Sequence, residues 1–289
     1  MKTAYIIDSS ASLNDQLLNH PDVYVMNLEI TWGDEIYPDT TDEAELKKFY
    51  QLLVESKELP RTNQPKQGDL ISTYEEIVNK GYTQVVVITL ASVISGTFNT
   101  SSMVSEAYSD KLDIRLIDSK GTSFIEEHLL ATAIELQKQG FELDEIEKQI
   151  NKLADQCKIY VLIEDLNAIV KGGRLSAVGG LIGSALKIKP ILEFDDEGYV
   201  EVFEKVRTTN RVYKRYVKLV GEAIQQFPQG IRIALAHGDC EDEALKVKAM
   251  IEKKYPGLEY RIGYLTPILG THGGKDSLGL GIMPKLLTE

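Results

Sequence analysis

The feature that most constrains the fold is the β-branched run at residues 84–90, which leads directly into a stretch at 91–97 that contains Ser92, Ser95 and Thr97. A short and almost wholly apolar run of this kind is typical of a strand buried on both faces of a parallel sheet. Similar runs at 5–7 and 114–117 also end in polar clusters. Helical repeats lie between these strands, so we expect a parallel α/β sheet in the first half of the chain.

Apolar residues at helical spacing predict amphipathic helices beside this sheet. We expect helices at 43–56, from about 69 onward, at 122–138 and at 143–156, and a further strand at 23–30. Pro65 holds the preceding residue, Gln64, in extended geometry. Residues 61–65 are therefore expected to form a constrained loop that carries Thr62.

The second half of the chain has a different texture. Residues 190–194, the turn at 195–198 and residues 199–206 are typical of an antiparallel hairpin. The other predicted elements are strands at 159–163, 231–237 and 258–265 and helices at 165–170, 210–227 and 241–255. We therefore expect an α/β protein of two domains, an N-terminal parallel-sheet α/β domain at 1–156 and a C-terminal α+β domain at 157–289.

The overall charge excludes some classes of function. The chain of 289 residues has a formal charge of -12, whereas nucleic-acid binding needs a basic face, which does not dominate here. Cys157 and Cys240 lie far apart without metal-ligand spacing, which fits a reducing cytoplasm. The 4 histidines are scattered, and no stretch approaches the length of a membrane span. We expect a cytoplasmic protein with no metal and no nucleic-acid partner.

Three polar residues are candidates for a ligand-binding site. Glycines follow an apolar run within 265–281, so His272 is expected at the tip of a strand, facing a cavity. Thr62 lies on the predicted loop, and Ser95 follows the strand at 84–90, at the sheet edge where open α/β sheets bind ligands. The hydroxyls and the imidazole are neutral or switchable donors, which together suit a carboxylate.

Each of these features also has an ordinary structural explanation. The glycine-rich stretch is compatible with a surface loop that carries a solvated histidine, Thr62 with a hydroxyl bonded to its own backbone, and Ser95 with a helix N-cap. The nearly uncharged segment 176–186 presents a similar choice. It is either a plain buried helix of the core or the lining of an apolar tunnel.

No familiar catalytic signature is present. The sequence lacks the phosphate loop, the dinucleotide-binding glycine motif after the first strand, the nucleophile elbow and the zinc-binding histidine pair. Asp8, Asp118 and His272 at the sheet edge still leave open a stand-alone phosphotransferase or hydrolase acting on a small molecule. Such an enzyme would have a polar pocket that binds metal or nucleotide.

Six ordered motifs, spread over essentially the whole chain, resemble those of the DegV family. They are Asp8-Ser9-Ser10-Ala11-Ser12-Leu13, Thr62-Asn63-Gln64-Pro65, Ser95-Gly96-Thr97-Phe98, Lys171-Gly172-Gly173-Arg174-Leu175-Ser176, Lys189-Pro190-Ile191-Leu192 and Gly270-Thr271-His272. Members of this family are the fatty-acid-binding subunits of bacterial fatty acid kinase. Two motifs differ from the usual family pattern, because Asn63 and Lys66 stand where serines are usual and the residues after His272 are changed.

The resemblance implies a long-chain fatty acid held between two α/β domains. Its carboxylate would be bound by Thr62 and Ser95, beside Gly96 and Thr97, with His272 close to it. Its tail would lie in a tunnel formed by Ile30, Leu166, Ile169, Leu181, Ile182, Leu186 and Ile191. The implied role is a carrier without a cofactor, not catalytic alone, which presents the carboxylate to a separate ATP-dependent kinase subunit for phosphorylation to an acyl phosphate.

Basic residues are concentrated in one part of this acidic chain. Spacing of three and four residues places several of them on one helical face, namely Arg211, Lys214, Arg215 and Lys218. This face is either simply solvated or a docking patch for the kinase or for anionic membrane lipid. Our candidates for partner docking are Arg174, Arg207 and Arg211. A sensor whose protein contacts change when lipid binds is a further alternative.

Overall fold

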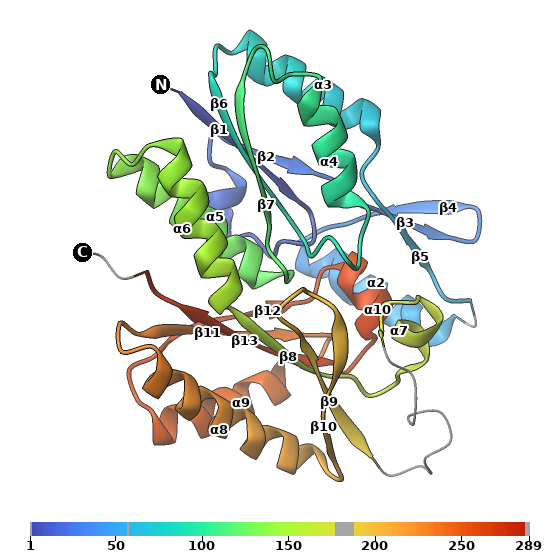
Figure 1. Cartoon of the computed structure of the whole chain (residues 1–289). Coiled ribbons are helices and arrows are strands. Elements are labelled where there is room, and N and C mark those ends of the chain that lie inside the picture. The colour runs from blue at the N-terminus through green and yellow to red at the C-terminus, as the bar shows by residue number, and fades with distance from the viewer. Residues whose placement is uncertain (1, 57, 177–187, 287–289) are drawn as a thin grey trace.

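Four parallel strands form the sheet of the first half, which confirms the prediction. They are β1 (Thr3–Asp8), β2 (Val23–Met26), β6 (Gln84–Thr89) and β7 (Asp113–Asp118), in the order β2-β1-β6-β7. The computed structural model describes residues 2–56, 58–176 and 188–286. Figure 1 shows this sheet in the upper part of the molecule.

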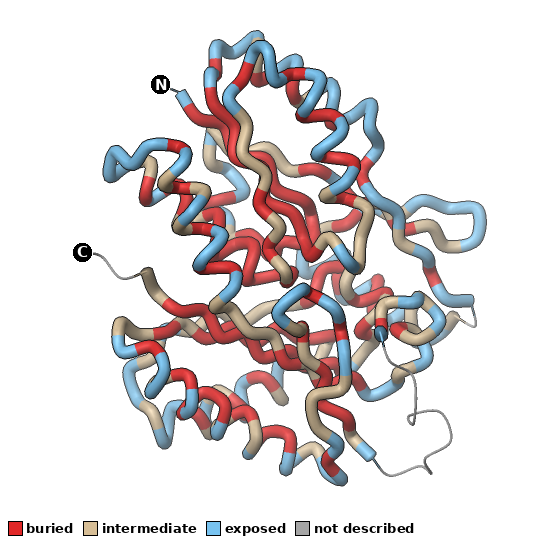
Figure 2. Tube along the Cα trace, viewed as in Figure 1, coloured by how far each residue is buried: buried red, intermediate tan, exposed pale blue. Residues whose placement is uncertain are grey.

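Helices cover both faces of the parallel sheet. They are α3 (Gln67–Asn79), α4 (Thr97–Glu106), α5 (Phe124–Lys138) and α6 (Leu143–Gln156). Because side chains alternate along a strand, Ile6 and Val87 pack with residues of α3 and α4, whereas Ile7 and Val86 pack with residues of α5 and α6. The central strands are therefore buried on both sides (Figure 2), which explains their continuous apolar sequence.

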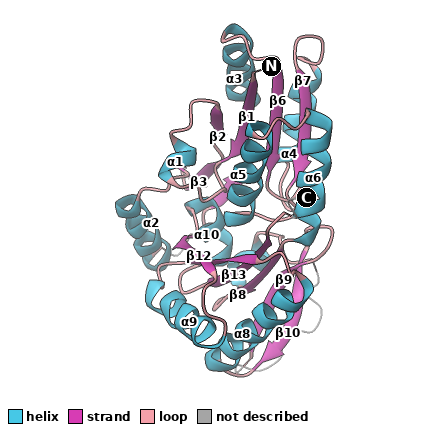
Figure 3. Ribbon diagram, turned by 90° about the vertical axis from the view of Figure 1, so that its left-hand side faces the viewer, coloured by secondary structure: helices cyan, strands magenta, loops and turns pink. Residues whose placement is uncertain are grey.

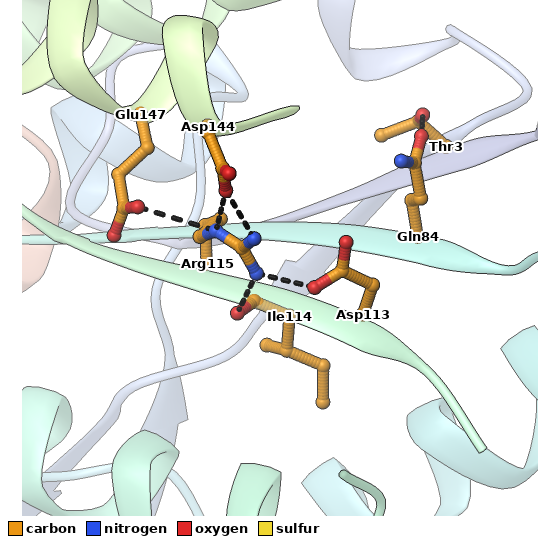
Figure 4. Close-up of polar contacts among 7 residues, drawn as sticks. All are labelled: Thr3, Gln84, Asp113, Ile114, Arg115, Asp144 and Glu147. Carbon is orange, nitrogen blue, oxygen red and sulfur yellow. Dashed lines mark hydrogen bonds and ion pairs between the residues drawn. The ribbon is translucent and has the colours of Figure 1, made fainter. Parts of the chain in front are cut away.

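Polar side chains join neighbouring elements at the rim of this sheet. The Arg115 guanidinium on β7 forms ion pairs with Asp144 and Glu147 on α6 (Figure 4). In the same view, the Thr3 hydroxyl donates to the amide oxygen of Gln84 at 3.0 Å and so joins β1 to β6. These contacts join β1 to β6 and β7 to α6, away from the carboxyl ends of the strands.

The second half forms a six-stranded mixed sheet in the order β10-β9-β8-β13-β11-β12. Its strands are β8 (Lys158–Leu162), β9 (Lys189–Phe194), β10 (Val200–Val206), β11 (Ile231–His237), β12 (Glu259–Tyr264) and β13 (Leu278–Pro284). The predicted hairpin is confirmed as the antiparallel pair of β9 and β10. Helices α8 (Thr209–Gln226) and α9 (Glu241–Lys254) cover one face (Figure 3). On the other face, Ala234, Ala236 and Met283 join the core around α5 and α6.

A small antiparallel sheet and three short helices complete the fold. The strands are β3 (Glu29–Trp32), β4 (Glu35–Pro38) and β5 (Arg61–Asn63), in the order β4-β3-β5, and the helices are α1 (Asp15–Leu18), α7 (Asn167–Lys171) and α10 (Pro267–Gly273). Helix α10 contacts α7, β3, β5 and the longer helix α2 (Glu43–Glu55). Elements of the first half therefore touch a helix from the end of the chain.

Three local predictions are wrong. The strand expected at 23–30 is two strands, β2 and β3, which belong to different sheets. Residues 61–63 form β5 rather than a loop, because their backbone pairs with β3. The stretch 265–281 holds helix α10 and the start of β13 rather than a strand tip. Most of the segment 176–186 lies outside the described residues, so the structure does not address its prediction.

Helix α10 forms in a glycine-rich sequence because its glycines allow close packing. Thr266 is the N-cap residue and Pro267 occupies the first turn, where its missing N–H costs nothing. A Cβ at Gly270 would lie 2.6 Å from the hydroxyl of Tyr50 and 2.9 Å from the ring of Phe49. The glycine therefore lets α10 lie directly against α2.

The two large sheets fall on either side of the predicted boundary at 156/157. Because α10 packs against elements of the first half, the division into two domains stays a prediction. No helix in the described part of the chain is both long enough and apolar enough to cross a membrane.

Candidate functional site

A cavity of about 350 Å³ lies where elements of the two halves meet, and we call it the main cavity. Its volume is in the range of small-molecule sites. The first half contributes β5 and the segments that follow the parallel strands, and the second half contributes α7, α10 and one face of β8, β9 and β10. The lining residues are Leu28, Thr62, Asn63, Gln64, Leu90, Ile94, Ser95, Gly96, Thr122, Val161, Ile163, Ile169, Arg174, Leu192, Phe194, Val200, Leu265, Ile268, Leu269, His272 and Gly273.

Most polar lining residues are linked to one another. We define the polar cluster as Thr62, Gln64, Ser95, Gly96, Arg174 and His272. Thr62 Oγ1 lies 2.9 Å from His272 Nε2. The Arg174 Nε–H donates at 3.2 Å to the carbonyl of Ile94, the residue before Ser95. The Gln64 amide lies over Gly96, where a Cβ would be only 2.0 Å from its oxygen. The polar groups are thus gathered in one region of an otherwise apolar wall.

The small sheet positions Thr62 opposite His272. Thr62 pairs with Ile30 in the register of β5 and β3, and the alternation of the strand leaves Arg61 and Asn63 exposed. His272 is near the end of α10, which packs on β5. The predicted meeting of Thr62 and His272 therefore occurs, but on a strand and a helix instead of two loops.

The electrostatic surroundings keep His272 neutral. Burial, and next the nearby Arg174 guanidinium, lower the pKa of His272 to about 4. Its Nδ1 atom is buried and has no hydrogen-bond partner among the described residues. A proton on Nε2 would be donated to Thr62 Oγ1, which leaves the Thr62 hydroxyl proton free for a ligand in the cavity.

Gly172 leaves the space that the His272 ring occupies. A Cβ at this position would lie 2.6 Å from His272 Nδ1 and 2.9 Å from its Cε1. Gly172 is the C-cap of α7, and α7 packs against α10. Of the two glycines in the motif at 171–176, Gly172 is thus the one that allows the close approach of the His272 ring.

Ser95 is supported in a similar way by Thr97. The two hydroxyl oxygens are 2.8 Å apart, and the backbone N–H of Thr97 donates to Ser95 Oγ at 3.3 Å. Thr97 is fully buried and is absent from the cavity wall, so it supports Ser95 instead of meeting a ligand directly. Gly96 is the N-cap of α4 and does line the cavity. Unpaired N–H groups at this helix end favour a negative charge.

The apolar wall includes several residues that the sequence analysis did not select. Leu192, Phe194 and Val200 come from the hairpin and pack in one cluster with Ile169 on α7. Ile94, between two serines of the loop before α4, packs against this cluster. Alternate apolar positions in β9 were the signal that could have identified Leu192 and Phe194.

Some tunnel residues are placed differently from the prediction. Ile191 lies on the opposite face of β9 and packs in the core beneath α8, because adjacent strand residues point to opposite faces. Ile30 is fully buried and packs with the lining residue Leu28, whereas Leu166 packs against the cluster that contains Ile169. Neither Ile30 nor Leu166 lines the cavity. The remaining predicted tunnel residues lie outside the described residues, namely Leu181, Ile182 and Leu186.

The three arginines predicted for partner docking separate into two groups. Arg174 lines the main cavity and donates from Nη1 to the Gly172 carbonyl at 2.5 Å, and its role in partner docking stays a prediction. Arg207 and Arg211 are exposed at the junction of β10 and α8. Neither forms an ion pair with any residue that the structure describes.

The carboxylates considered for a stand-alone enzyme do not reach the main cavity. Asp8 is fully buried, and its carboxylate accepts the backbone N–H groups of Ser10 at 3.0 Å and Leu90 at 2.8 Å. Asp118 accepts the backbone N–H of Lys120 at 2.9 Å. The grouping of these acids with the cavity histidine is therefore wrong. Across 2–56, 58–176 and 188–286, no cluster of three or more His, Cys, Asp or Glu is arranged to hold a metal ion.

The fold and site define a class of protein: a two-sheet α/β protein that encloses an apolar cavity with polar groups gathered in one part of its wall. Comparison with known proteins gives the family. The family model of DegV matches residues 2–285. Protein DegV of Bacillus subtilis (strain 168) is 34% identical over 282 residues, covering 97% of this chain and 98% of that protein. This chain therefore belongs to the DegV family, which confirms the resemblance.

Solved structures confirm the fold class. A fatty acid binding DegV family protein, SAG1342 from Streptococcus agalactiae, has a TM-score of 0.92 and 32% identity, covering 99% of this chain and 100% of that chain. DegV, a fatty acid binding protein from Bacillus subtilis, has a TM-score of 0.87 and 32% identity with the same coverage, 99% and 100%. The N-terminal parallel sheet and the C-terminal mixed sheet are thus features shared with these proteins.

Proposed function

We propose that this protein is a carrier that holds a long-chain fatty acid in the main cavity. The carboxylate would be bound by Thr62 and Ser95, with His272 supporting Thr62, and the tail would follow the apolar wall. The observation that carries this proposal is a largely apolar cavity whose neutral hydroxyl and imidazole groups lie within one polar cluster. The solved relatives described as fatty acid binding support it.

Burial of the tail supplies most of the affinity in this proposal. About 15 methylenes at roughly 0.8 kcal/mol each give on the order of 12 kcal/mol of gross transfer free energy. Association and chain ordering oppose binding by several kcal/mol, so micromolar or tighter binding is expected from the tail. The head group then selects a carboxylate over an ester, which cannot use all the donors.

Neutral donors also suit the chemistry that we propose for the bound acid. A separate ATP-dependent kinase subunit would phosphorylate the carboxylate to an acyl phosphate in the cytoplasm, while the lipid stays on this protein. The hydrogen bonds to the carboxylate would come from the neutral hydroxyls of Thr62 and Ser95. The Arg174 guanidinium of the same cluster is held by the Ile94 and Gly172 carbonyls, so the carboxylate oxygen stays nucleophilic. This chain would then need no cofactor and would not be catalytic alone.

Extraction of the purified protein with organic solvent, followed by mass spectrometry, tests the carrier function. We expect stoichiometric long-chain fatty acid in the wild type and its loss when Thr62→Ala and Ser95→Ala are combined. A matched control combines Ser72→Ala and Thr73→Ala, which remove the hydroxyls of an exposed and a half-buried residue on α3 that bond only to their own helix backbone. A wild-type protein that is empty and takes up no acyl chain would exclude the carrier function.

The exposed arginines are proposed to dock the kinase, with anionic membrane lipid as the other candidate partner. Combining Arg207→Glu and Arg211→Glu should leave lipid content intact and slow acyl-phosphate formation by the cognate kinase. The control is Lys148→Glu with Lys152→Glu, which reverses two exposed charges on α6. Unchanged turnover in the arginine variant would remove this patch from the mechanism.

A further inference from the structure

A second cavity, of about 180 Å³, lies between α5 and the strands β11, β12 and β13, and we call it the α5 cavity. It shares no lining residue with the main cavity. Its wall consists of Asn14, Phe124, Glu127, His128, Ala131, Arg232, Glu259, Tyr260, Arg261 and Met283. The carrier function assigns no role to this group of charged and polar residues.

The charges around the α5 cavity have a positive excess in an otherwise acidic protein. Arg261 pairs with Glu127 at 2.9 Å, and Arg232 pairs with Glu259 at 2.7 Å. Lys285 also forms an ion pair with Glu259, at 2.5 Å, and adds a third positive charge. Three cations therefore stand against two carboxylates, which favours an anionic ligand.

Both arginines retain hydrogen-bond donors for a ligand. Each uses Nε to bind its carboxylate. Among the described residues, the two Nη atoms of Arg232 and Nη1 of Arg261 have no hydrogen-bond partner, and Nη2 of Arg261 has only a long contact of 3.4 Å with the Ser12 carbonyl. The other carboxylate oxygen of Glu127 accepts from the Asn14 side chain at 2.6 Å. The remaining N–H groups of Arg261 therefore stay available to a ligand. Planar guanidinium forks of this kind match phosphate and carboxylate oxygens.

The wall of the α5 cavity also contains a buried hydrogen-bond acceptor to which no group among the described residues donates. His128 is only 6% exposed, and its Nε2 lies 2.9 Å from the Pro284 carbonyl, which can only accept. The ring proton therefore sits on Nε2, and Nδ1 carries a lone pair. Nδ1 is buried and lacks a hydrogen-bond partner in the described part of the chain. A ligand that combines anionic oxygens with an O–H group would match both the arginines and this histidine.

We propose that the α5 cavity binds a phosphate group, either inorganic phosphate or a small phosphate ester. Arg232 and Arg261 bind its oxygens, and Nδ1 of His128 accepts a hydrogen bond from its hydroxyl group. Inorganic phosphate keeps an O–H group at neutral pH, and a phosphate ester, whose second pKa is about 6, keeps one in its singly charged form. Sulfate has the same shape without this proton, so it distinguishes recognition of phosphate from simple attraction of an anion.

Isothermal titration calorimetry at constant ionic strength tests this site with sodium phosphate, glycerol phosphate and sodium sulfate as probes. We expect saturable binding of one phosphate compound in the millimolar range or tighter, and the tighter of the two compounds identifies the source of the group. Arg232→Gln should weaken that binding by about tenfold or more, because it removes charged donors. Glu259 keeps Lys285 as a partner in this variant, so the fold is expected to persist.

Arg261→Gln provides a second variant with the same expected loss. The control is Arg115→Gln, which removes an arginine held by carboxylates on the far rim of the parallel sheet (Figure 4). Phosphate binding that falls in both cavity variants and persists in the control supports the site. No saturable phosphate binding up to ~10 mM, equal binding of sulfate, or unchanged affinity in Arg232→Gln overturns it.

Discussion

Two hydroxyl groups carry recognition of the carboxylate in the proposed complex, and each is hydrogen-bonded by a second residue. His272 supports Thr62 at 2.9 Å, and Thr97 supports Ser95 at 2.8 Å. A hydroxyl that accepts one hydrogen bond from the protein is oriented to donate its own proton. The residues that touch the ligand are therefore fewer than the residues that specify the site.

Thr62→Val tests the hydroxyl directly, because it keeps the shape of the side chain. A hydrogen bond to a charged carboxylate contributes roughly 1.5–3 kcal/mol, so we expect fatty acid binding to weaken by about 10- to 100-fold. Displacement of a fluorescent fatty acid measures the affinity. Thr73→Val, at a half-buried position of α3 that does not line the main cavity, is the control. The role of the Thr62 hydroxyl would be ruled out by equal affinities of the two variants.

Gly172→Ala tests the packing that holds His272. The added Cβ would lie 2.6 Å from the ring nitrogen, so the ring must shift from the position in which its Nε2 meets Thr62. We expect a loss of fatty acid affinity of about tenfold or more, similar to loss of the hydrogen bond itself. Gly68→Ala is the matched control, since a Cβ there meets nothing within 4 Å. Retention of full affinity in Gly172→Ala would show that the position of the ring is unimportant.

At the scale of elements, regular packing was predictable and long-range contacts were not. The predicted helix at 143–156 and strand at 231–237 coincide with α6 and β11, because a periodic apolar pattern records which face is buried. Helix α10 was missed, since glycines disfavour a helix and the packing of Gly270 against Tyr50 and Phe49 is not visible in the sequence. Ile191 was chosen for the cavity although the alternation of Leu192 and Phe194 along β9 was the signal for the face that lines it.

The site itself was predictable in part through its motifs. Thr62, Ser95 and His272 were selected by resemblance and by the expected ends of strands, and all three line the main cavity. The hydrogen bond between Thr62 and His272 joins residues 210 positions apart, so local sequence cannot encode it. The place of Arg174 in the cavity wall was not predicted for a similar reason, because it depends on the contact between α7 and α10.

The helix that carries His272 is held at its other end by a buried acid. Asp39 accepts the backbone N–H of Ile268 at 2.9 Å, in the first turn of α10. Burial raises the pKa of Asp39 to about 7, although the hydrogen bond to Ile268 opposes this shift. Because the folded pKa is above the unfolded value, the folded state binds more protons between pH 4 and 7, and stability falls as pH rises through this window.

Asp39→Asn should remove this pH dependence. The ionised carboxylate destabilises the wild type increasingly with pH, so the free energy of unfolding of the wild type relative to Asp39→Asn should fall by about 2–3 kcal/mol between pH ~5 and ~8. Urea denaturation at the two pH values measures it. A difference between the proteins that does not vary with pH would show that Asp39 titrates normally.

At the scale of the whole molecule, one cavity wall is assembled from both halves of the chain. Thr62 and Ser95 come from the first half, whereas His272 and the hairpin residues Leu192 and Phe194 come from the second. A ligand in the cavity would therefore link the parallel sheet to the mixed sheet. Binding to the folded state alone stabilises the whole protein by mass action.

Removal and return of the lipid tests this linkage. Adding fatty acid to delipidated protein at about 100 times its dissociation constant should raise the free energy of unfolding by about 2.7 kcal/mol. Denaturant titration measures the shift. The variant with Thr62→Ala and Ser95→Ala should show a smaller shift at the same ligand concentration. An equal shift in this variant would mean that the stabilising lipid binds elsewhere.

Native mass spectrometry of delipidated protein mixed with palmitic acid is the most direct test that the main cavity holds the acyl chain. Val161 lines this cavity, and Val54 is 62% exposed on α2, so Val161→Trp and Val54→Trp form a matched pair. We expect one fatty acid per chain in the wild type and in Val54→Trp, and little or none in Val161→Trp. A wild-type chain that binds no fatty acid, or a Val161→Trp chain that binds it equally well, would contradict the proposed site.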